Sequence, residues 1–228
     1  MRHNKNEQGV TRILLVEDHP VFIFGLRELI NQEKDLQVCG EAEDVTSAWE
    51  KIQTLEPDMV IVDISLKGRN GIELIRDINK HYKALPVLVL SMHEESLYAE
   101  RALAAGARGY IMKQEASKGI VQAIRCVLGG EIYASQNLMR TILNRFVNQT
   151  DPVNSPIQNL TDRELEVFIA IGKGLTTKQI AGKLHLSIKT IGTYRERIKE
   201  KLGLQNASEL IRHAVRWIEL RTDEANTE

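Results

Sequence analysis

The chain has 228 residues, a formal net charge of −1, 43% hydrophobic residues and 27% charged residues. These are ordinary globular values, and they exclude a disordered or collagen-like chain. No apolar run approaches the roughly 20 residues that a membrane span needs, so we expect no membrane segment. The N-terminus lacks the hydrophobic core of a secretory signal, and Cys39 and Cys126 are too few for a disulfide framework. We therefore expect two buried free thiols and a cytoplasmic protein.

Charge is unevenly distributed along the chain. Residues 12–130 carry 14 Lys+Arg and 18 Asp+Glu, whereas residues 157–220 carry 11 Lys+Arg and 7 Asp+Glu. An acidic first part and a basic second part suggest two domains with separate tasks, the second of them beside a polyanion.

The first part alternates short apolar runs with longer amphipathic stretches. The runs are RILLVED, LQVCGEA, MVIVDI, PVLVLSM and GYIMK, which begin at residues 12, 36, 59, 86 and 109. The uninterrupted apolar character of MVIV and VLVL is typical of strands buried on both faces. This alternation predicts an α/β domain over residues 12–130, with five parallel strands and helices on both faces of the sheet.

Residues 131–157 lose this rhythm. The stretch from about Leu138 to Val147 has the pattern of a short helix, and the polar segment NQTDPVNSP that follows is typical of a linker. We therefore expect residues 131–157 to form a linker that contains a short helix. Residues 1–11 and 222–228 carry no recognisable motif, and we expect flexible ends there.

From Leu160 onward the pattern is purely helical, which predicts a small all-α domain over residues 158–228. Four helices are expected near residues 163–172, 177–184, 188–201 and 207–220. Each follows residues that cap helix N-termini, namely Thr161 with Glu164, Thr176 with Gln179, Ser187, and Asn206 with Glu209. Gly174 and Gly203 stand where helices must end. In the third helix we expect one packed apolar stripe, formed by Ile188, Ile191, Ile198 and Leu202.

Chemically matched side chains follow the predicted strands. Ligands of an open parallel sheet bind beyond the carboxyl ends of its strands, where this chain has Glu17, Asp18, Asp63, Ser91 and Lys113. Three carboxylates repel one another and need a cation, and oxygen ligands with room for water suit Mg²⁺. Such an edge is suited to receive a phosphoryl group, which a carboxylate can accept as an acyl phosphate. Asp63, at the centre of the sheet, is the predicted nucleophile.

The segments RILLVEDHP, VIVDISLKGRNGIELI, VLVLSMH and AGARGYIMK, in this order and spacing, resemble the receiver domain of bacterial two-component response regulators. The resemblance implies a doubly wound, flavodoxin-like fold and phosphorylation of Asp63 by a cognate sensor histidine kinase. It implies Mg²⁺ binding by Glu17, Asp18, Asp63 and the backbone carbonyl of Ser65. It also implies phosphoryl contacts from Ser91 and Lys113, and a switch of Tyr110 together with Ser91. His19 is interpreted as a structural residue of the strand-to-helix turn, because Pro20 follows it.

The second part contains two predicted helices joined by the short turn His185-Leu186-Ser187, an arrangement common among DNA-binding proteins. The exposed face of the second of these helices mixes charges of both signs, so the residues alone also fit a generic exposed helix. The segment from Leu160 to Trp217, however, is similar to the LuxR-type (GerE-type) helix-turn-helix domain. Together the two parts resemble the NarL/FixJ class of response regulators.

The second resemblance implies contacts with double-stranded DNA and a homodimer in the active, DNA-bound state. RNA polymerase is a further candidate partner, and no membrane partner is expected. Backbone phosphates would be contacted by Thr177, Lys178, Ser187, Lys189, Thr190 and Tyr194. The residues where the family reads base edges are Gly192, Thr193 and Glu196, and Arg197 shares their exposed face.

Two alternatives remain open on the sequence. The first is a phosphatase that forms an aspartyl phosphate, which would need a second acid two residues after the nucleophile, where this chain has Ser65. The second is a DNA-binding protein that acts independently of phosphorylation, with its first domain serving as a protein-interaction module.

Overall fold

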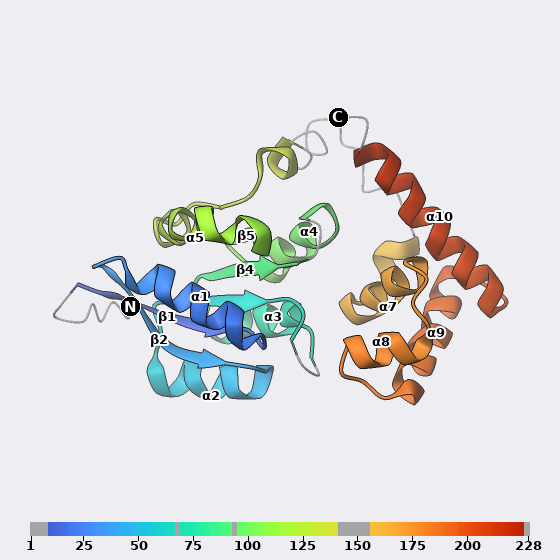
Figure 1. Cartoon of the computed structure of the whole chain (residues 1–228), viewed down its shortest axis with the longest axis horizontal. Coiled ribbons are helices and arrows are strands. Elements are labelled where there is room, and N and C mark those ends of the chain that lie inside the picture. Colours follow the sequence, from blue (N-terminus) through green and yellow to red (C-terminus); the bar gives the residue numbers. More distant parts are fainter. Residues whose placement is uncertain (1–8, 67–68, 93–94, 141–155, 226–228) are drawn as a thin grey trace. The chain divides into compact units, whose positions relative to one another are not determined.

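The computed structural model describes residues 9–66, 69–92, 95–140 and 156–225. The chain divides into two compact units, Met1–Val147 and Asn148–Glu228, each of which is considered by itself (Figure 1). Residues 136–140 are helical, so the start of the helix predicted near Leu138 is present. The remainder of that prediction, the segment up to residue 155, and the outermost residues of both expected flexible ends lie outside the described residues.

The first unit is built on one parallel sheet with the strand order β2-β1-β3-β4-β5, which confirms the predicted doubly wound, flavodoxin-like architecture. The strands β3 and β4 are buried along their whole length, as the continuous apolar runs predict. The strands are β1 (Thr11–Val16), β2 (Leu36–Ala42), β3 (Met59–Asp63), β4 (Val87–Ser91) and β5 (Gly109–Met112).

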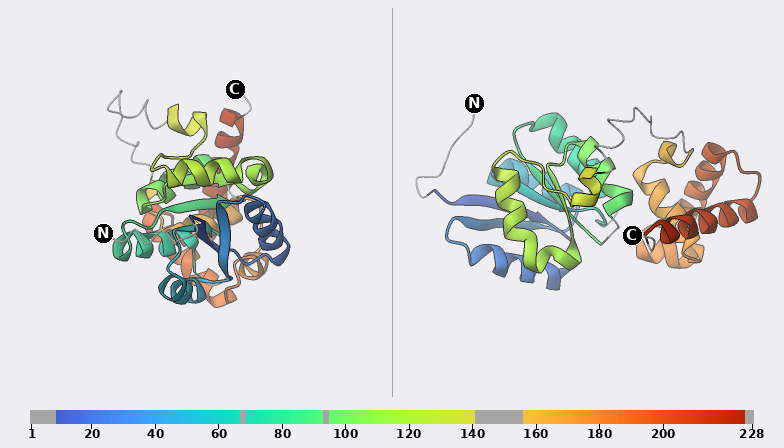
Figure 2. Two further views of the ribbon diagram at one scale, coloured as in Figure 1. Left: turned by 90° about the vertical axis from the view of Figure 1, so that its left-hand side faces the viewer. Right: turned by 90° about the horizontal axis from the view of Figure 1, so that it is seen from above.

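Five helices cover this sheet on both faces (Figure 2). α1 and α5 pack on one face, where Ile23 and Ile120 join a core that includes Ile13, Ile61 and Leu90 from the strands. The other face carries α2, α3 and α4. The bounds are α1 (Pro20–Asn31), α2 (Val45–Leu55), α3 (Gly71–His81), α4 (Glu95–Ala105) and α5 (Lys113–Leu128).

Two features of this unit differ from the sequence predictions. Tyr133, inside the predicted linker, accepts a hydrogen bond from the backbone of Tyr110 at 2.8 Å and donates one to Arg108 at 3.0 Å, so this segment lies against β5. Cys39 and Cys126 are free thiols but only half-buried. The expectation of buried thiols was wrong because Cys39 lies on the edge strand, where the register against β1 shifts, and Cys126 lies near the end of α5.

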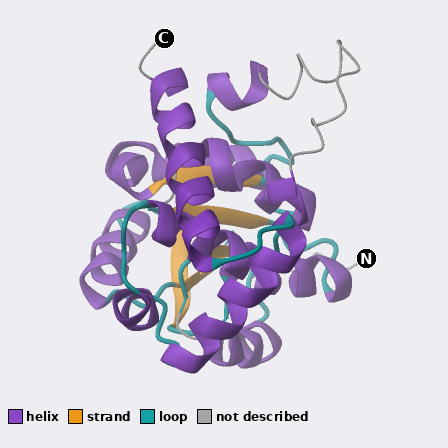
Figure 3. Ribbon diagram, turned by 90° about the vertical axis from the view of Figure 1, so that its right-hand side faces the viewer, coloured by secondary structure: helices purple, strands orange, loops and turns teal. Residues whose placement is uncertain are grey.

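The second unit is helical throughout its described part (Figure 3). It comprises η1 (Pro156–Asn159), α7 (Asp162–Gly172), α8 (Thr177–Lys183), α9 (Ile188–Leu202) and α10 (Ala207–Ala225). Reciprocal capping boxes at Thr161 and Thr176 confirm two predicted helix starts. Gly203 ends α9 with a φ of 66°, in the left-handed region that glycine adopts without strain.

The packed stripe of α9 is shorter than predicted. Ile191 and Ile198 are fully buried, but Ile188 is 57% exposed. The prediction was wrong for Ile188 because this residue opens α9, so its turn extends past the packed part of the helix. Across the described residues, none of the helices combines the length and apolar character that crossing a bilayer requires.

Candidate functional site

The carboxyl ends of β1, β3, β4 and β5 bring the predicted acidic site together. Glu17 and Asp18 directly follow β1, Asp63 ends β3, and Lys113 opens α5 directly after β5. Glu17 and Asp63 are each 1% exposed, and Lys113 is 7% exposed. These charged groups are therefore almost entirely removed from bulk water, which strengthens the electrostatic interactions among them.

The backbone at the end of β3 is fixed by the start of α3. The side chain of Asn70 is fully buried and caps α3 by accepting a hydrogen bond from Ile72 N at 2.7 Å. Gly71 N donates to the Ile64 carbonyl at 2.8 Å, and a Cβ on Gly71 would overlap the backbone carbonyl of Asp63. Neither residue was among the predicted site residues, although the Asn-Gly pair before an amphipathic stretch is a helix-start signal that identifies them.

Lys113 links two of the carboxylates. Its Nζ lies 2.8 Å from Asp63 Oδ2 and 2.5 Å from Glu17 Oε2. The ring centroid of Phe22, on α1, lies 4.9 Å from the same ammonium group, within the range of a cation–π interaction. No sequence signal distinguishes Phe22 from the other apolar residues of α1, so only the structure identifies this contact.

Burial and like charge shape the ionisation of this site. Burial, followed by the charge of Glu17, raises the pKa of Asp63 to about 6, although Lys113 acts in the opposite direction. Burial lowers the pKa of Lys113, but Asp63 and Glu17 outweigh burial and the net shift is upward. One ammonium group thus faces three carboxyl groups, and further positive charge would stabilise the cluster.

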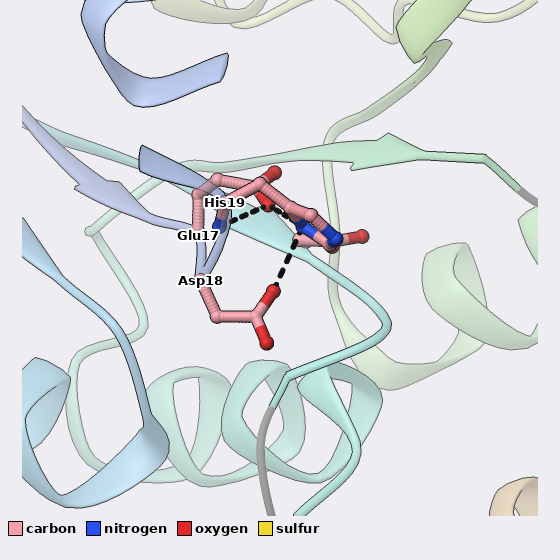
Figure 4. A group of neighbouring side chains, drawn as sticks. Glu17, Asp18 and His19 are labelled. Carbon is pink, nitrogen blue, oxygen red and sulfur yellow. Dashed lines mark hydrogen bonds and ion pairs between the residues drawn. The ribbon is translucent and has the colours of Figure 1, made fainter. Parts of the chain in front are cut away.

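His19 lies beside the first two carboxylates (Figure 4). Its Nδ1 is 2.7 Å from Glu17 Oε1 and 2.9 Å from Asp18 Oδ1. The side chain of His19 is 65% exposed, so the imidazole lies at the mouth of the site while the carboxylates lie beneath it.

The arrangement fits a divalent cation. Glu17, Asp18, His19 and Asp63 each offer one ligand atom, and these atoms all lie within 4.8 Å of one another. Asp63 Oδ1 is buried and has no hydrogen-bond partner among the described residues. Buried carboxylate oxygens are hard donors of the kind that Mg²⁺ prefers, so the residues fit the predicted metal.

Of the remaining predicted residues, Ser91 and Ser65 lie at this edge of the sheet, whereas Tyr110 lies two residues before the end of β5, opposite Val89 of β4. Ser91 ends β4 and is fully buried, and Tyr110 is buried on the neighbouring strand β5. Ser65 is half-buried, and its backbone hydrogen bond to Asp63 acts to lower the pKa of that carboxyl group.

The second unit presents α8 and α9 as consecutive helices joined by residues 184–187. Of the predicted DNA-contacting residues, six are exposed, namely Lys178, Ser187, Lys189, Thr193, Glu196 and Arg197. Four are half-buried, namely Thr177, Thr190, Gly192 and Tyr194. The Ser187 side chain accepts a hydrogen bond from Thr190 N at 3.0 Å and thereby caps α9. Glu196 pairs with Lys199 at 2.8 Å on the helix surface.

Comparisons with known proteins agree with both halves of this description. Residues 13–125 match the family described as "Response regulator receiver domain", and residues 158–214 match "Bacterial regulatory proteins, luxR family". "Oxygen regulatory protein NreC" of Staphylococcus epidermidis is 34% identical over 211 residues, which cover 90% of this chain and 97% of that protein.

Two solved structures are also similar. RcsB from Salmonella enterica serovar Typhimurium, bound to promoter rprA in the presence of phosphomimetic BeF3⁻, has a TM-score of 0.59 and 26% identity, covering 90% of this chain and 98% of that one. A LuxR-family two-component response regulator from Aurantimonas has a TM-score of 0.56 and 36% identity, covering 60% of this chain and 99% of that one. The chain therefore belongs to the two-component response regulators of the NarL/FixJ class, transcription regulators that join a receiver domain to a DNA-binding helix-turn-helix.

Proposed function

We propose that Asp63 accepts a phosphoryl group from the phosphohistidine of a cognate sensor histidine kinase. A carboxylate oxygen of Asp63 forms the new bond to phosphorus, the bond from phosphorus to the histidine nitrogen breaks, and that nitrogen keeps the electron pair. The observation that carries this proposal is the pairing of Lys113 with Asp63 Oδ2 at 2.8 Å, which leaves Oδ1 of the same buried carboxylate without a hydrogen bond among the described residues.

Each neighbouring residue has a role in this step. Glu17, Asp18, Asp63 and the carbonyl of Ser65 would hold Mg²⁺, which when bound supplies positive charge toward the phosphoryl oxygens. Lys113 would neutralise negative charge on the transferred group. The hydroxyl of Ser91 donates a hydrogen bond to the phosphoryl group, and Tyr110 changes position with Ser91 as the switch.

This switch controls sequence-specific DNA binding by a domain of residues 158–228, joined through residues 131–157 to a receiver of residues 12–130. Phosphate contacts come from Thr177, Lys178, Ser187, Lys189, Thr190 and Tyr194, and base or groove contacts from Gly192, Thr193, Glu196 and Arg197. The active form is a homodimer on DNA, and RNA polymerase is a downstream partner. Because the proposed target is bacterial DNA, the site of action is the cytoplasm.

The proposal is for a regulator and not for an enzyme that turns over phosphate esters. A phosphatase that uses an aspartyl phosphate needs a carboxylic acid two residues beyond its nucleophile to protonate the leaving group. This chain has Ser65 at that position, and a hydroxyl group is a far weaker acid than a carboxyl group.

The test is the intact mass of the full chain after incubation with Mg²⁺ and a small-molecule phosphodonor. We expect one phosphoryl adduct, absent in Asp63→Asn and in the presence of a chelator. Phosphorylation should then increase the affinity of the full chain for DNA. An adduct that persists in folded Asp63→Asn would overturn the assignment of the acceptor, and equal DNA affinity with and without the adduct would overturn the switch.

A further inference from the structure

His19 occupies a helix N-cap position that it does not use for capping. It precedes α1, whose first residue is Pro20, and its side chain makes no hydrogen bond to the helix. N-cap positions usually carry Ser, Thr, Asp or Asn because those side chains accept backbone hydrogen bonds. The imidazole of His19 is directed instead toward Glu17 and Asp18 (Figure 4), so a capping role does not account for this side chain.

Lys113 contacts one oxygen of each of two carboxylates, Glu17 Oε2 and Asp63 Oδ2. Of the other two oxygens, Glu17 Oε1 accepts a hydrogen bond from the backbone N–H of His19 at 3.1 Å and lies 2.7 Å from His19 Nδ1. Asp63 Oδ1 is buried without a hydrogen-bond partner among the described residues. His19 Nδ1 thus lies among carboxylate oxygens that Lys113 does not contact.

The spacing of these atoms suits ligands of one metal ion. Adjacent ligands of an octahedral ion with bonds of about 2.1 Å lie about 3 Å apart. His19 Nδ1 is 2.7 Å from Glu17 Oε1 and 2.9 Å from Asp18 Oδ1. The backbone supports this position, because the residue before a proline is restricted to extended conformations and His19 has φ −101° and ψ 105°.

We infer that His19 is a ligand in this site and that it makes the site selective for divalent first-row transition ions of the Ni²⁺ or Zn²⁺ type over Mg²⁺. Imidazole suits these ions, whereas carboxylates and water suit Mg²⁺. The inference rests on the proposed metal site of the phosphorylation reaction and adds to it a fifth protein ligand, beyond the oxygen donors of Glu17, Asp18, Asp63 and the Ser65 carbonyl. Mg²⁺ uses the oxygen donors alone, and a transition ion uses those donors together with His19 Nδ1.

The test compares Ni²⁺ and Mg²⁺ binding to the full chain by isothermal titration calorimetry. In His19→Phe we expect the affinity for Ni²⁺ to fall at least about tenfold, while the ratio of Ni²⁺ to Mg²⁺ affinity falls by a similar factor. His81→Phe removes an exposed imidazole of α3 and should leave that ratio unchanged. Asp63→Asn should weaken both ions, which locates them in the same site. Circular dichroism and the Tm establish that each variant is folded.

Two results would overturn the inference. Unchanged Ni²⁺ affinity in folded His19→Phe would mean that the imidazole is not a ligand, and an equal loss for both ions would mean that His19 only positions the carboxylates. Mass labelling of the same variant with Mg²⁺ and a phosphodonor separates this failure from failure of the proposed function. Labelling without Ni²⁺ selectivity overturns only the role of His19, whereas wild-type protein that binds no Mg²⁺ and takes no label overturns the phosphoacceptor proposal.

Discussion

Gly71 and Asp63 are in such close backbone contact that a side chain on Gly71 would overlap the carbonyl of Asp63. Gly71 opens α3, and its N–H also bonds to the carbonyl of Ile64, the residue after Asp63. The proposed nucleophile therefore depends on the absence of a side chain eight residues further along the chain.

The Gly71→Ala variant tests this dependence. The added methyl group must displace backbone and not a flexible side chain, so we expect the free energy of unfolding to fall by about 1–3 kcal/mol. The displacement of the Asp63 backbone should also slow phosphorylation, which is measured by intact mass over time. Gly25→Ala is the matched control, because Gly25 lies inside α1 and a Cβ there meets nothing within 4 Å. We expect Gly25→Ala to stabilise the protein by up to about 1 kcal/mol. Equal stability changes in the two variants would contradict the close-contact argument.

Lys113 is the next residue to test, because it is the positive group that contacts both Glu17 and Asp63. Lys113→Met keeps the length of the side chain and removes its charge. We expect the rate of phosphorylation to fall about 100-fold or more, as for the loss of one donor to developing negative charge. The rate is measured with a small-molecule phosphodonor at saturating Mg²⁺.

The control for Lys113 is Lys118→Met on the same helix, where Lys118 is exposed. Lys118→Met should be phosphorylated at the wild-type rate. If folded Lys113→Met also kept that rate, the ammonium group would have no part in phosphoryl transfer.

The sequence was sufficient for the architecture and for the charged residues of the site. Continuous apolar runs identified β3 and β4, and strand ends identified Glu17, Asp18, Asp63 and Lys113, because parallel strands place their carboxyl ends at one edge. These signals depend on local pattern and topology alone.

The remaining features depend on contacts between distant segments. Phe22 lies against Lys113, and Gly71 against Asp63, and neither pairing leaves a periodic trace in the sequence. Ile188 has the helical phase of the packed stripe, yet it is exposed because phase does not state where along a helix the packing begins. The orientation of His19 likewise depends on side-chain geometry and not on its place beside Pro20.

The pair formed by Glu164 and Lys201 predicts a pH-dependent stability of the second unit. Lys201 Nζ lies 2.6 Å from Glu164 Oε2. Burial raises the pKa of Glu164, but hydrogen bonds from Lys201 and Thr161 outweigh burial and hold the pKa below its ordinary value. A carboxyl group with a lowered folded-state pKa stabilises the fold above its unfolded pKa, and this contribution is lost as the pH falls through the folded pKa.

We therefore expect Glu164→Gln to lower stability by about 1 kcal/mol at pH 7, and the difference from wild type to shrink as the pH falls below about 4.3. Thermal unfolding of the full chain is followed by Trp217 fluorescence in a Trp49→Phe background. Trp217 reports on the second unit because it packs against Phe168 of α7. Glu200→Gln, at an exposed position of α9, should show the same dependence of the Tm on pH as the wild type. A constant difference between Glu164→Gln and wild type at every pH would contradict the linkage.

The contrast between Ile188 and Ile191 gives a prediction about packing. Ile191 is fully buried and Ile188 is 57% exposed, although they lie one turn apart on α9. Ile191→Ala should lower the free energy of unfolding by about 2–5 kcal/mol, whereas Ile188→Ala should change it by no more than about 0.5 kcal/mol. Denaturant unfolding followed by Trp217 measures both. Comparable losses would show that the stripe begins at Ile188 after all.

Lys189 provides the test of DNA contact that is least dependent on knowing the operator. It is exposed in the first turn of α9, and as a proposed phosphate contact it adds charge without reading sequence. The affinity of phosphorylated full-length protein for a duplex selected from a random library is measured across salt concentrations. In Lys189→Ala we expect the magnitude of the negative slope of log K against log salt to decrease by about 0.9, the value for one phosphate contact. Lys118→Ala, in the first unit, should keep the wild-type slope. A residue that contacts bases changes the preference for DNA sequence and leaves the salt slope unchanged. That result for Lys189→Ala would show that Lys189 contacts bases and not backbone phosphates.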